Sequence, residues 1–142
     1  GVDAAEAERI AAQTKLPVWL AVNLRDPAEV RRWRRETYHR IAGIVIDAGA
    51  YGSGKTFGWE QSGQDEMCCA VRAFREELLA EGRTFVLAGG LNAENVAEGI
   101  RIFSPDVADI SSGVEVLCDG KRMKSKIKII EFKKAVRKTD GV

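Results

Sequence analysis

The sequence predicts an α/β fold in which one helix precedes four parallel strand–helix units. Four short segments are nearly continuous apolar runs rich in Val, Ile and Leu, as expected of parallel strands covered on their outer face: 16–22, 41–47, 84–89 and 107–112. Helical patterns separate these runs, and a parallel crossover needs such a helix to return along the sheet. No linker or change of composition interrupts the chain, so residues 1–142 are predicted to form a single domain.

Five helices are expected, each with an amphipathic period: 3–14, 27–40, 65–81, 93–103 and 125–138. Their ends carry recognisable signals, which are the pair Asp3 and Glu6, Pro27 in a first turn, the stop at Gly82, and the caps Asn92 and Ser125. The apolar side chains predicted to face inward are Val30 and Trp33 (with Thr37), Met67, Val71, Phe74 and Leu78, Val96, Ile100 and Phe103, and Ile129, Phe132 and Val136.

The composition is that of a soluble globular domain. The chain has 142 residues, 45% hydrophobic and 30% charged, with a net charge of +1. No apolar run reaches the roughly 20 residues of a membrane-spanning helix, and the N-terminal segment has neither a Met nor a signal-peptide pattern. A membrane partner and export are therefore not expected, and the reading frame is expected to extend upstream.

The cysteines and the single histidine fit neither a disulfide framework nor a metal site. Cys68 and Cys69 are adjacent in a helical pattern and Cys118 is remote from both, so no metal is expected and a reducing, cytoplasmic location is predicted. His39 lies in a highly charged helical stretch and is predicted to face solvent.

Small residues gather after three of the predicted strands, at 47–49, 88–90 and 111–113. In parallel α/β folds this edge collects loop amides and helix N-termini, which bind anions. The pattern indicates one anionic ligand, most simply a phosphate.

The segment Gly49-Ala-Tyr-Gly-Ser-Gly54-Lys55-Thr56 matches the nucleotide-binding pattern G-x-x-x-x-G-K-[ST]. That motif needs a helix to begin at its Lys-Thr pair, whereas here two glycines follow within seven residues, at 58 and 63, and no apolar period is present. We therefore interpret the segment as a Gly-rich lid whose Lys55 reaches an anionic substrate on closure. Nucleotide triphosphate binding stays as a third alternative.

Three blocks in order resemble the phosphoribosylanthranilate isomerase family. Residues 85–100, with the sequence FVLAGGLNAENVAEGI, and 109–115, with the sequence DISSGVE, resemble its last two strand–helix units. Residues 47–59 resemble its sixth strand and following loop, which usually reads G-G-T-G-K-T-F-D-W, and 16–22 with Asp26 resembles the fifth. The resemblance implies a (β/α)8 barrel of which this chain is a partial form, strands five to eight.

The family catalyses, without cofactor, the Amadori rearrangement of N-(5-phosphoribosyl)anthranilate to 1-(2-carboxyphenylamino)-1-deoxyribulose 5-phosphate in tryptophan biosynthesis. By resemblance, Asp47 is the general acid, and a hydrophobic surround from Ile44 and Ile46 is expected to help it hold its proton. The implied substrate and phosphate ligands are Gly89, Gly90, Asp109, Ser112 and Gly113, and the implied lid carries Gly52, Gly54 and Lys55.

Three departures from the family pattern are visible. Gly58 stands where the family's loop has Asp, and residues 116–123 replace a stretch that commonly holds Pro-Gly and Lys-Asp pairs. The family's general base is a cysteine in a Lys-Ile-Cys-Gly pattern on its first strand, and this sequence contains no such motif. Cys118 is predicted to lie in a loop after the last strand, where it could not replace that base.

A (β/α)8 barrel needs about 200 residues or more, and four strands alone would leave apolar barrel-facing residues and two edges exposed. We expect the chain to be the C-terminal portion of such a barrel; the alternatives are a half-barrel that dimerises or pairs with an N-terminal half, and a degenerate paralogue. Two functions follow, an isomerase that is inactive as this isolated chain and a non-catalytic phosphate-binding half-barrel or assembly module.

The C-terminal segment is rich in basic residues, but the charge of the whole chain is +1. We interpret the basic side chains as a solvated outer face and expect no nucleic-acid partner. They are Lys121, Arg122, Lys124, Lys126, Lys128, Lys133, Lys134, Arg137 and Lys138.

Overall fold

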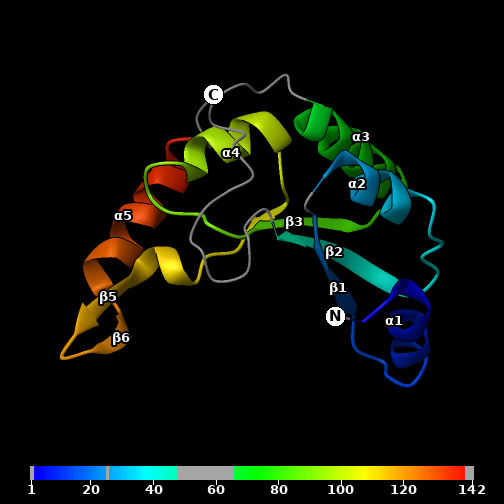
Figure 1. The fold of residues 1–142 in the computed structure, drawn as a ribbon, viewed down its shortest axis with the longest axis horizontal. Coiled ribbons are helices and arrows are strands. Elements are labelled where there is room, and N and C mark those ends of the chain that lie inside the picture. Colours follow the sequence, from blue (N-terminus) through cyan, green and yellow to red (C-terminus); the bar gives the residue numbers. More distant parts are fainter. Residues whose placement is uncertain (1, 25, 48–65, 140–142) are drawn as a thin grey trace.

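Four parallel strands form the central sheet, in the order β1-β2-β3-β4 (Figure 1). A computed structural model describes residues 2–24, 26–47 and 66–139. The strands are β1 (Val18–Asn23), β2 (Ile41–Asp47), β3 (Thr84–Ala88) and β4 (Val107–Ala108). The predicted α/β class and strand–helix order are confirmed.

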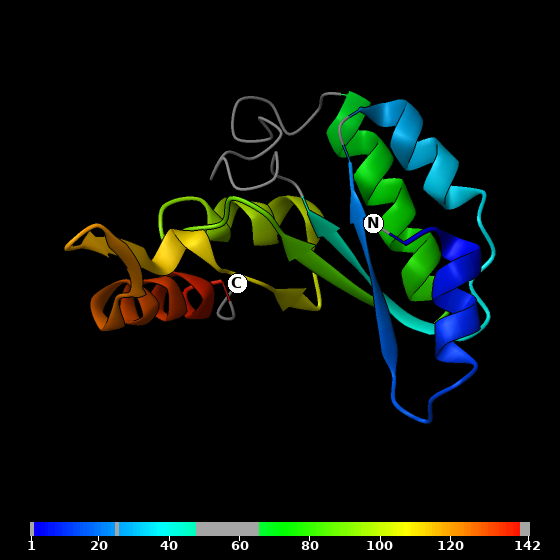
Figure 2. The ribbon, with the colours of Figure 1, turned by 60° about the horizontal axis from the view of Figure 1, so that its bottom comes forward.

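The helices of the described residues are α1 (Ala4–Ala11), α2 (Pro27–Arg34), α3 (Glu66–Ala80), α4 (Val96–Phe103) and α5 (Lys126–Arg137). In Figure 2, α2 and α3 lie side by side next to β1, with α1 at one end of the molecule and α5 at the other. Several start signals act as predicted: the carboxylate of Asp3 accepts a hydrogen bond from the Glu6 N–H, Pro27 begins α2, and the Ser125 hydroxyl accepts from the Lys128 N–H.

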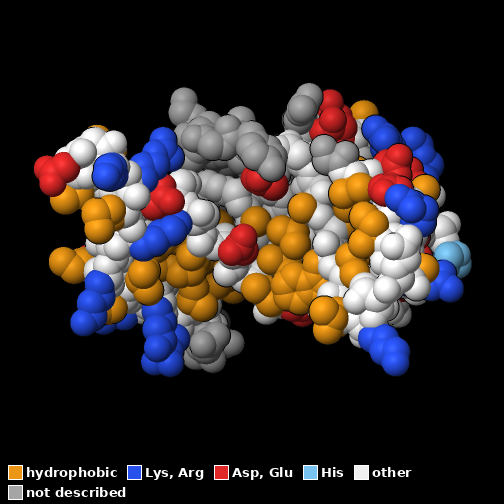
Figure 3. Space-filling model, turned by 90° about the horizontal axis from the view of Figure 1, so that it is seen from below, with side chains coloured by type: hydrophobic (Ala, Val, Ile, Leu, Met, Phe, Trp, Pro, Cys, Tyr) orange, Lys and Arg blue, Asp and Glu red, His pale blue; other side chains and the backbone are white. Residues whose placement is uncertain are grey.

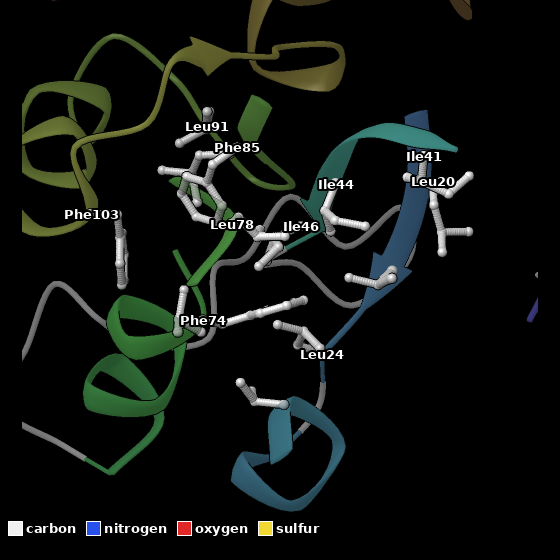
Figure 4. Packing of buried hydrophobic residues seen from close by; sticks show 14 of the residues in the cluster. Leu20, Leu24, Ile41, Ile44, Ile46, Phe74, Leu78, Phe85, Leu91 and Phe103 are labelled. Atoms are coloured by element: carbon white, nitrogen blue, oxygen red, sulfur yellow. The ribbon is translucent and has the colours of Figure 1, made fainter. Parts of the chain in front are cut away.

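The core lies between the sheet and the helices. Alternate strand residues point toward the helices and are buried, among them Leu20, Val22, Ile44, Ile46, Phe85 and Leu87. The predicted inward residues Val71, Phe74 and Leu78 of α3 meet them in one hydrophobic cluster, and Figure 4 shows the side chains of Ile44, Ile46 and Phe74 pointing into it. Each large side chain buried in this way contributes about 1.5–3 kcal/mol.

The opposite face of the sheet is open. Trp19 on β1 and Val107 on β4 are 46% and 37% exposed. Figure 3 shows hydrophobic side chains gathered across the middle of this face, with lysine and arginine toward its margins. We call it the inner face, because it would line the interior if the sheet continued around a barrel.

Helix α2 ends at Arg34 and not near residue 40 as predicted. The Trp33 carbonyl accepts hydrogen bonds from the Tyr38 hydroxyl, at 2.7 Å, and from the Glu36 N–H. The Glu8 carboxylate of α1 accepts from the N–H groups of residues 39–41. These bonds replace the next turn of helix, and His39 is exposed beyond α2 rather than on it.

Helix α4 begins at Val96, three residues later than predicted. Asn92 does accept hydrogen bonds, from the N–H groups of Glu94 and Asn95, but it caps the turn ahead of the helix. Helix α5 also differs, because Phe132 is buried as predicted whereas Ile129 is 46% exposed and Val136 only half-buried. Val136 packs against the edge of the core cluster, whereas Ile129 points away from it.

A hairpin that the sequence reading missed follows the sheet. Strands β5 (Glu115–Cys118) and β6 (Lys121–Lys124) pair in antiparallel fashion, so Cys118 lies in a strand and not in a loop. Asp119 and Gly120 both have positive φ, 48° and 74°, as a two-residue hairpin turn requires. Figure 1 shows the hairpin and α5 at the end of the molecule remote from α1.

Candidate functional site

Asp47 is the last residue of β2 and lies half-buried at the carboxyl edge of the sheet. In the strand register it stands between Asn23 of β1 and Ala88 of β3. Because side chains alternate along a strand, Asp47 shares the inner face with Val45, Trp19 and Asn23. A carboxyl there faces the space that a ligand over this edge would occupy.

The expected hydrophobic surround of Asp47 is wrong. Ile44 and Ile46 are fully buried, but they belong to the set of strand residues that face the helices. The residue before Asp47 in the strand points to the other side of the sheet, so neither isoleucine encloses the carboxyl.

Gly89 and Gly90 directly follow β3 and both have left-handed backbones, with φ of 81° and 68°. Such a backbone strongly favours glycine, and successive N–H groups in a turn can form a concavity that binds anions. The Asn95 side chain holds the loop by donating to the Gly90 carbonyl, at 3.1 Å, and accepting from the Asn92 N–H, at 2.9 Å.

Ser112 and Gly113 lie in a 3-10 turn (Ser112–Val114), although they were predicted to end or follow a strand reaching residue 112. A Cβ placed on Gly113 would lie 1.9 Å from the Leu91 carbonyl oxygen, so the turn approaches the Gly89–Leu91 loop more closely than a residue with a side chain permits. In the described part of the chain, the N–H groups of Ser112 and Gly113 donate to no acceptor. Two loops from neighbouring units therefore meet beside free backbone donors.

Asp109 lies two residues beyond Val107 of β4 and is exposed. Its N–H donates to the Leu87 carbonyl at 2.8 Å, which extends the pairing of β4 with β3 by one step. Asp109 thus falls at the same carboxyl edge as Asp47, two strands away in the sheet order.

Some predicted features lie outside the described residues, namely the lid glycines Gly52 and Gly54, Lys55, and the rest of the Gly49–Thr56 motif. The cysteines do not reach the inner face: Cys68 is buried on α3, Cys69 is exposed on α3, and Cys118 is exposed on the hairpin.

In the described ranges no three His, Cys, Asp or Glu side chains gather in a way that could hold a metal ion. No helix there is long and apolar enough to span a membrane. A cavity of about 780 Å³ opens beside β1, lined by residues of α1, β1 and α2 together with Asp47.

Three polar residues near the site were not identified from the sequence as part of it. Asn23 is the last residue of β1 and pairs with Asp47 in the register. Its position at the end of a predicted strand could have identified it. No sequence pattern identifies Asn95, because its side-chain amide meets Gly90 only in the folded chain. Lys124 on β6 donates to Ser111 and Glu115, a contact that depends on the unforeseen hairpin.

The arrangement is matched by known proteins. The sequence model of the family described as N-(5'phosphoribosyl)anthranilate (PRA) isomerase matches residues 1–134. The chain belongs to this family. The resemblance noted in the sequence is therefore confirmed.

Curated members and solved structures of the PRA isomerase family agree. An N-(5'-phosphoribosyl)anthranilate isomerase of Halorubrum lacusprofundi is 39% identical over 124 residues, covering 82% of this chain and 49% of its own length. That of Moorella thermoacetica is 36% identical, covering 84% of this chain and 47% of itself. The phosphoribosyl anthranilate isomerase structure from Thermotoga maritima superposes with a TM-score of 0.67 at 27% identity, covering 100% of this chain and 60% of that one. The chain thus spans about half the length of the curated relatives it matches.

Proposed function

We propose that this chain supplies the general acid and the phosphate site of a phosphoribosylanthranilate isomerase. The observation that carries the proposal is the meeting of Gly113 with Leu91, which joins the Gly89–Gly90 loop and the 3-10 turn into one group of backbone donors. This group lies at the carboxyl edge where β2 ends in Asp47. Family membership supports the phosphate of a phosphoribosyl substrate as that anion.

In the proposed reaction Asp47 protonates the ribose ring oxygen, and the bond from that oxygen to C1 breaks to give an iminium. A general base then removes the proton from C2, and its electron pair forms the C1–C2 double bond of an enolamine. Tautomerisation yields the 1-amino-1-deoxyketose. The electrons stay within the substrate, so the proposed reaction uses no cofactor.

The other residues hold the substrate. Gly89, Gly90, Ser112 and Gly113 present amides to the phosphate, with the Ser112 hydroxyl beside them, and Asp109 lies beside the anthranilate end. Gly52, Gly54 and Lys55 belong to the proposed lid. Ground-state contacts to the phosphate serve mainly affinity, whereas Asp47 acts on the bonds that break.

None of the three cysteines lies on the inner face, so the base is proposed to come from outside this chain's four strands. We propose that residues 1–142 are the C-terminal portion of a barrel whose N-terminal half pairs with the edges of β1 and β4 and covers the inner face. A homodimer is the second arrangement we propose, since the phosphoribosylanthranilate isomerase of Thermotoga maritima, a structural neighbour of this chain, is dimeric. The cytoplasm is the proposed location.

The test joins this chain to the N-terminal half of a relative and follows the loss of substrate fluorescence on turnover. Turnover by the joined protein, with phosphate binding but no turnover by this chain alone, is the expected result. A folded joined protein that binds ribose 5-phosphate without turnover would instead identify a non-catalytic phosphate-binding module. Magnesium-dependent ATP binding that Lys55→Ala abolishes would favour the nucleotide alternative.

A further inference from the structure

Lys124 makes an unusually complete set of contacts for a lysine on the surface. Its ammonium group donates to the Ser111 carbonyl at 2.8 Å, to the Ser111 hydroxyl at 3.1 Å and to the Glu115 carboxylate at 2.9 Å. A lysine has three N–H donors, so each is used. The side chain is 50% exposed, yet these contacts fix its position.

The hairpin brings Lys124 to this place. Lys124 pairs with Glu115 in the register of β5 and β6. Two hydrogen bonds hold the base of the hairpin. The Ser125 N–H donates to the Val114 carbonyl and the Lys128 ammonium donates to the Glu115 carbonyl, each at 2.8 Å. The hydrogen bond from Lys124 also lowers the pKa of the Glu115 carboxyl, in keeping with a direct ion pair.

The Ser111 carbonyl, which accepts from Lys124 at 2.8 Å and from the Val114 N–H at 3.4 Å, is linked to the next amide. The Ser111 carbonyl and the Ser112 N–H belong to one planar trans peptide unit and point in opposite directions. When Lys124 holds the carbonyl on the hairpin side, the Ser112 N–H is directed to the other side. That N–H donates to no acceptor in the described part of the chain.

We propose that Lys124 is a positioning residue, which holds the Ser111–Ser112 peptide so that the amides of the 3-10 turn receive the substrate phosphate. This inference rests on the proposed phosphate site. Lys124 acts through the peptide, since the Glu115 carboxylate also has Arg122 as a partner, at 3.7 Å.

The test uses this chain, with inorganic phosphate and ribose 5-phosphate as probes, and compares Lys124→Met with Lys121→Met. Lys121 lies on the same strand, is exposed, and has the same charge, but its ammonium group makes no hydrogen bond or ion pair with the described residues. Losing charge-assisted contacts of this kind is expected to weaken phosphate binding roughly tenfold in Lys124→Met. Lys121→Met should change it less than about twofold, since an exposed charge is worth little.

Ionic strength separates positioning from simple attraction. Raising the salt from about 0.1 M to about 1 M shortens the screening length from about 10 Å to about 3 Å, so a loss caused only by a missing charge should disappear. The loss in Lys124→Met should persist. Amide NMR signals of Ser112 and Gly113 should shift in Lys124→Met and stay unchanged in Lys121→Met, while Lys124→Arg should restore part of the affinity.

In the protein that joins this chain to the N-terminal half of a relative, Lys124→Met should raise KM with little change in kcat, because the contact serves binding of the phosphate. Equal phosphate affinities for the two lysine variants would overturn the assignment of Lys124, as would a loss that high salt abolishes. Absence of phosphate binding by the unmodified chain would overturn the phosphate site itself, and with it this role.

Discussion

The close approach of Gly113 to Leu91 gives a sharp prediction about the proposed phosphate site. In Gly113→Ala the new methyl carbon would start 1.9 Å from the Leu91 carbonyl oxygen, where an ordinary contact needs 3.4 Å or more. The two loops must therefore move apart by about 1.5 Å. The obstacle is backbone on both sides, so no side-chain rotation relieves it.

Overpacking of this size costs about 1–3 kcal/mol in unfolding free energy. The effect on binding should be larger than the stability loss suggests, because the displaced groups are the proposed phosphate donors, and a misplacement of about 1 Å can cost on the order of 10²-fold. We expect Gly113→Ala to weaken ribose 5-phosphate binding at least about tenfold, measured by calorimetry or amide NMR, with stability measured by urea unfolding.

Gly82→Ala is the matched control. Gly82 also has a positive φ, 69°, but its added Cβ would meet nothing within 4 Å, and it lies at the end of α3, away from the site. It should lose about 1 kcal/mol of stability through backbone strain alone and keep its affinity. If Gly113→Ala bound ribose 5-phosphate as well as Gly82→Ala does, the two loops would not form one phosphate site.

Three further predictions concern other parts of the chain. Asp47→Asn should lower kcat of the joined protein about 10²–10⁴-fold with unchanged phosphate affinity. A smaller loss of kcat would show that Asp47 is not the general acid. Desolvation raises the pKa of the Glu8 carboxyl but three backbone N–H groups outweigh it, leaving the pKa below its ordinary value. Glu8→Gln should therefore lose about 1–2 kcal/mol at neutral pH, and urea unfolding should show this difference shrink once the pH falls below the ordinary Glu value of 4.5 and vanish below the lowered pKa of Glu8. Trp19→Gln, on the open inner face, should change the stability of this chain by less than about 1 kcal/mol but weaken its association with an N-terminal half, as measured by titration; unchanged association would argue against that contact.

The sequence predicted the sheet well because its evidence is local. Segments such as 41–47 are apolar runs bounded by clear helix signals, and the structure places β2 at those residues. Family resemblance then located Asp47 and the Gly89–Gly90 loop, since both occupy strand ends that the pattern already marks. The Ile44 and Ile46 surround failed because it ignored the alternation of strand side chains.

What the sequence did not predict depends on contacts between distant segments. Helix α2 stops early because Tyr38 folds back onto Trp33 and because Glu8, some thirty residues earlier, binds the amides at the start of β2. The hairpin differs, because it has a local signal: Asp119-Gly120 is a typical two-residue hairpin turn. The signal was missed because residues 116–123 were compared only with the Pro-Gly and Lys-Asp pairs of the family.

The distribution of roles along the chain follows from the geometry of a parallel sheet. The proposed phosphate ligands come from adjacent units, because neighbouring strand ends lie close enough for Gly113 to touch Leu91. The base of the proposed reaction would come from a wall that faces Asp47 across the inner face, because none of the three cysteines lies on that face. Binding of a phosphate and catalysis of its rearrangement should therefore separate experimentally in this chain, with affinity retained by residues 84–125 and turnover appearing only when a partner surface covers Trp19 and Val107.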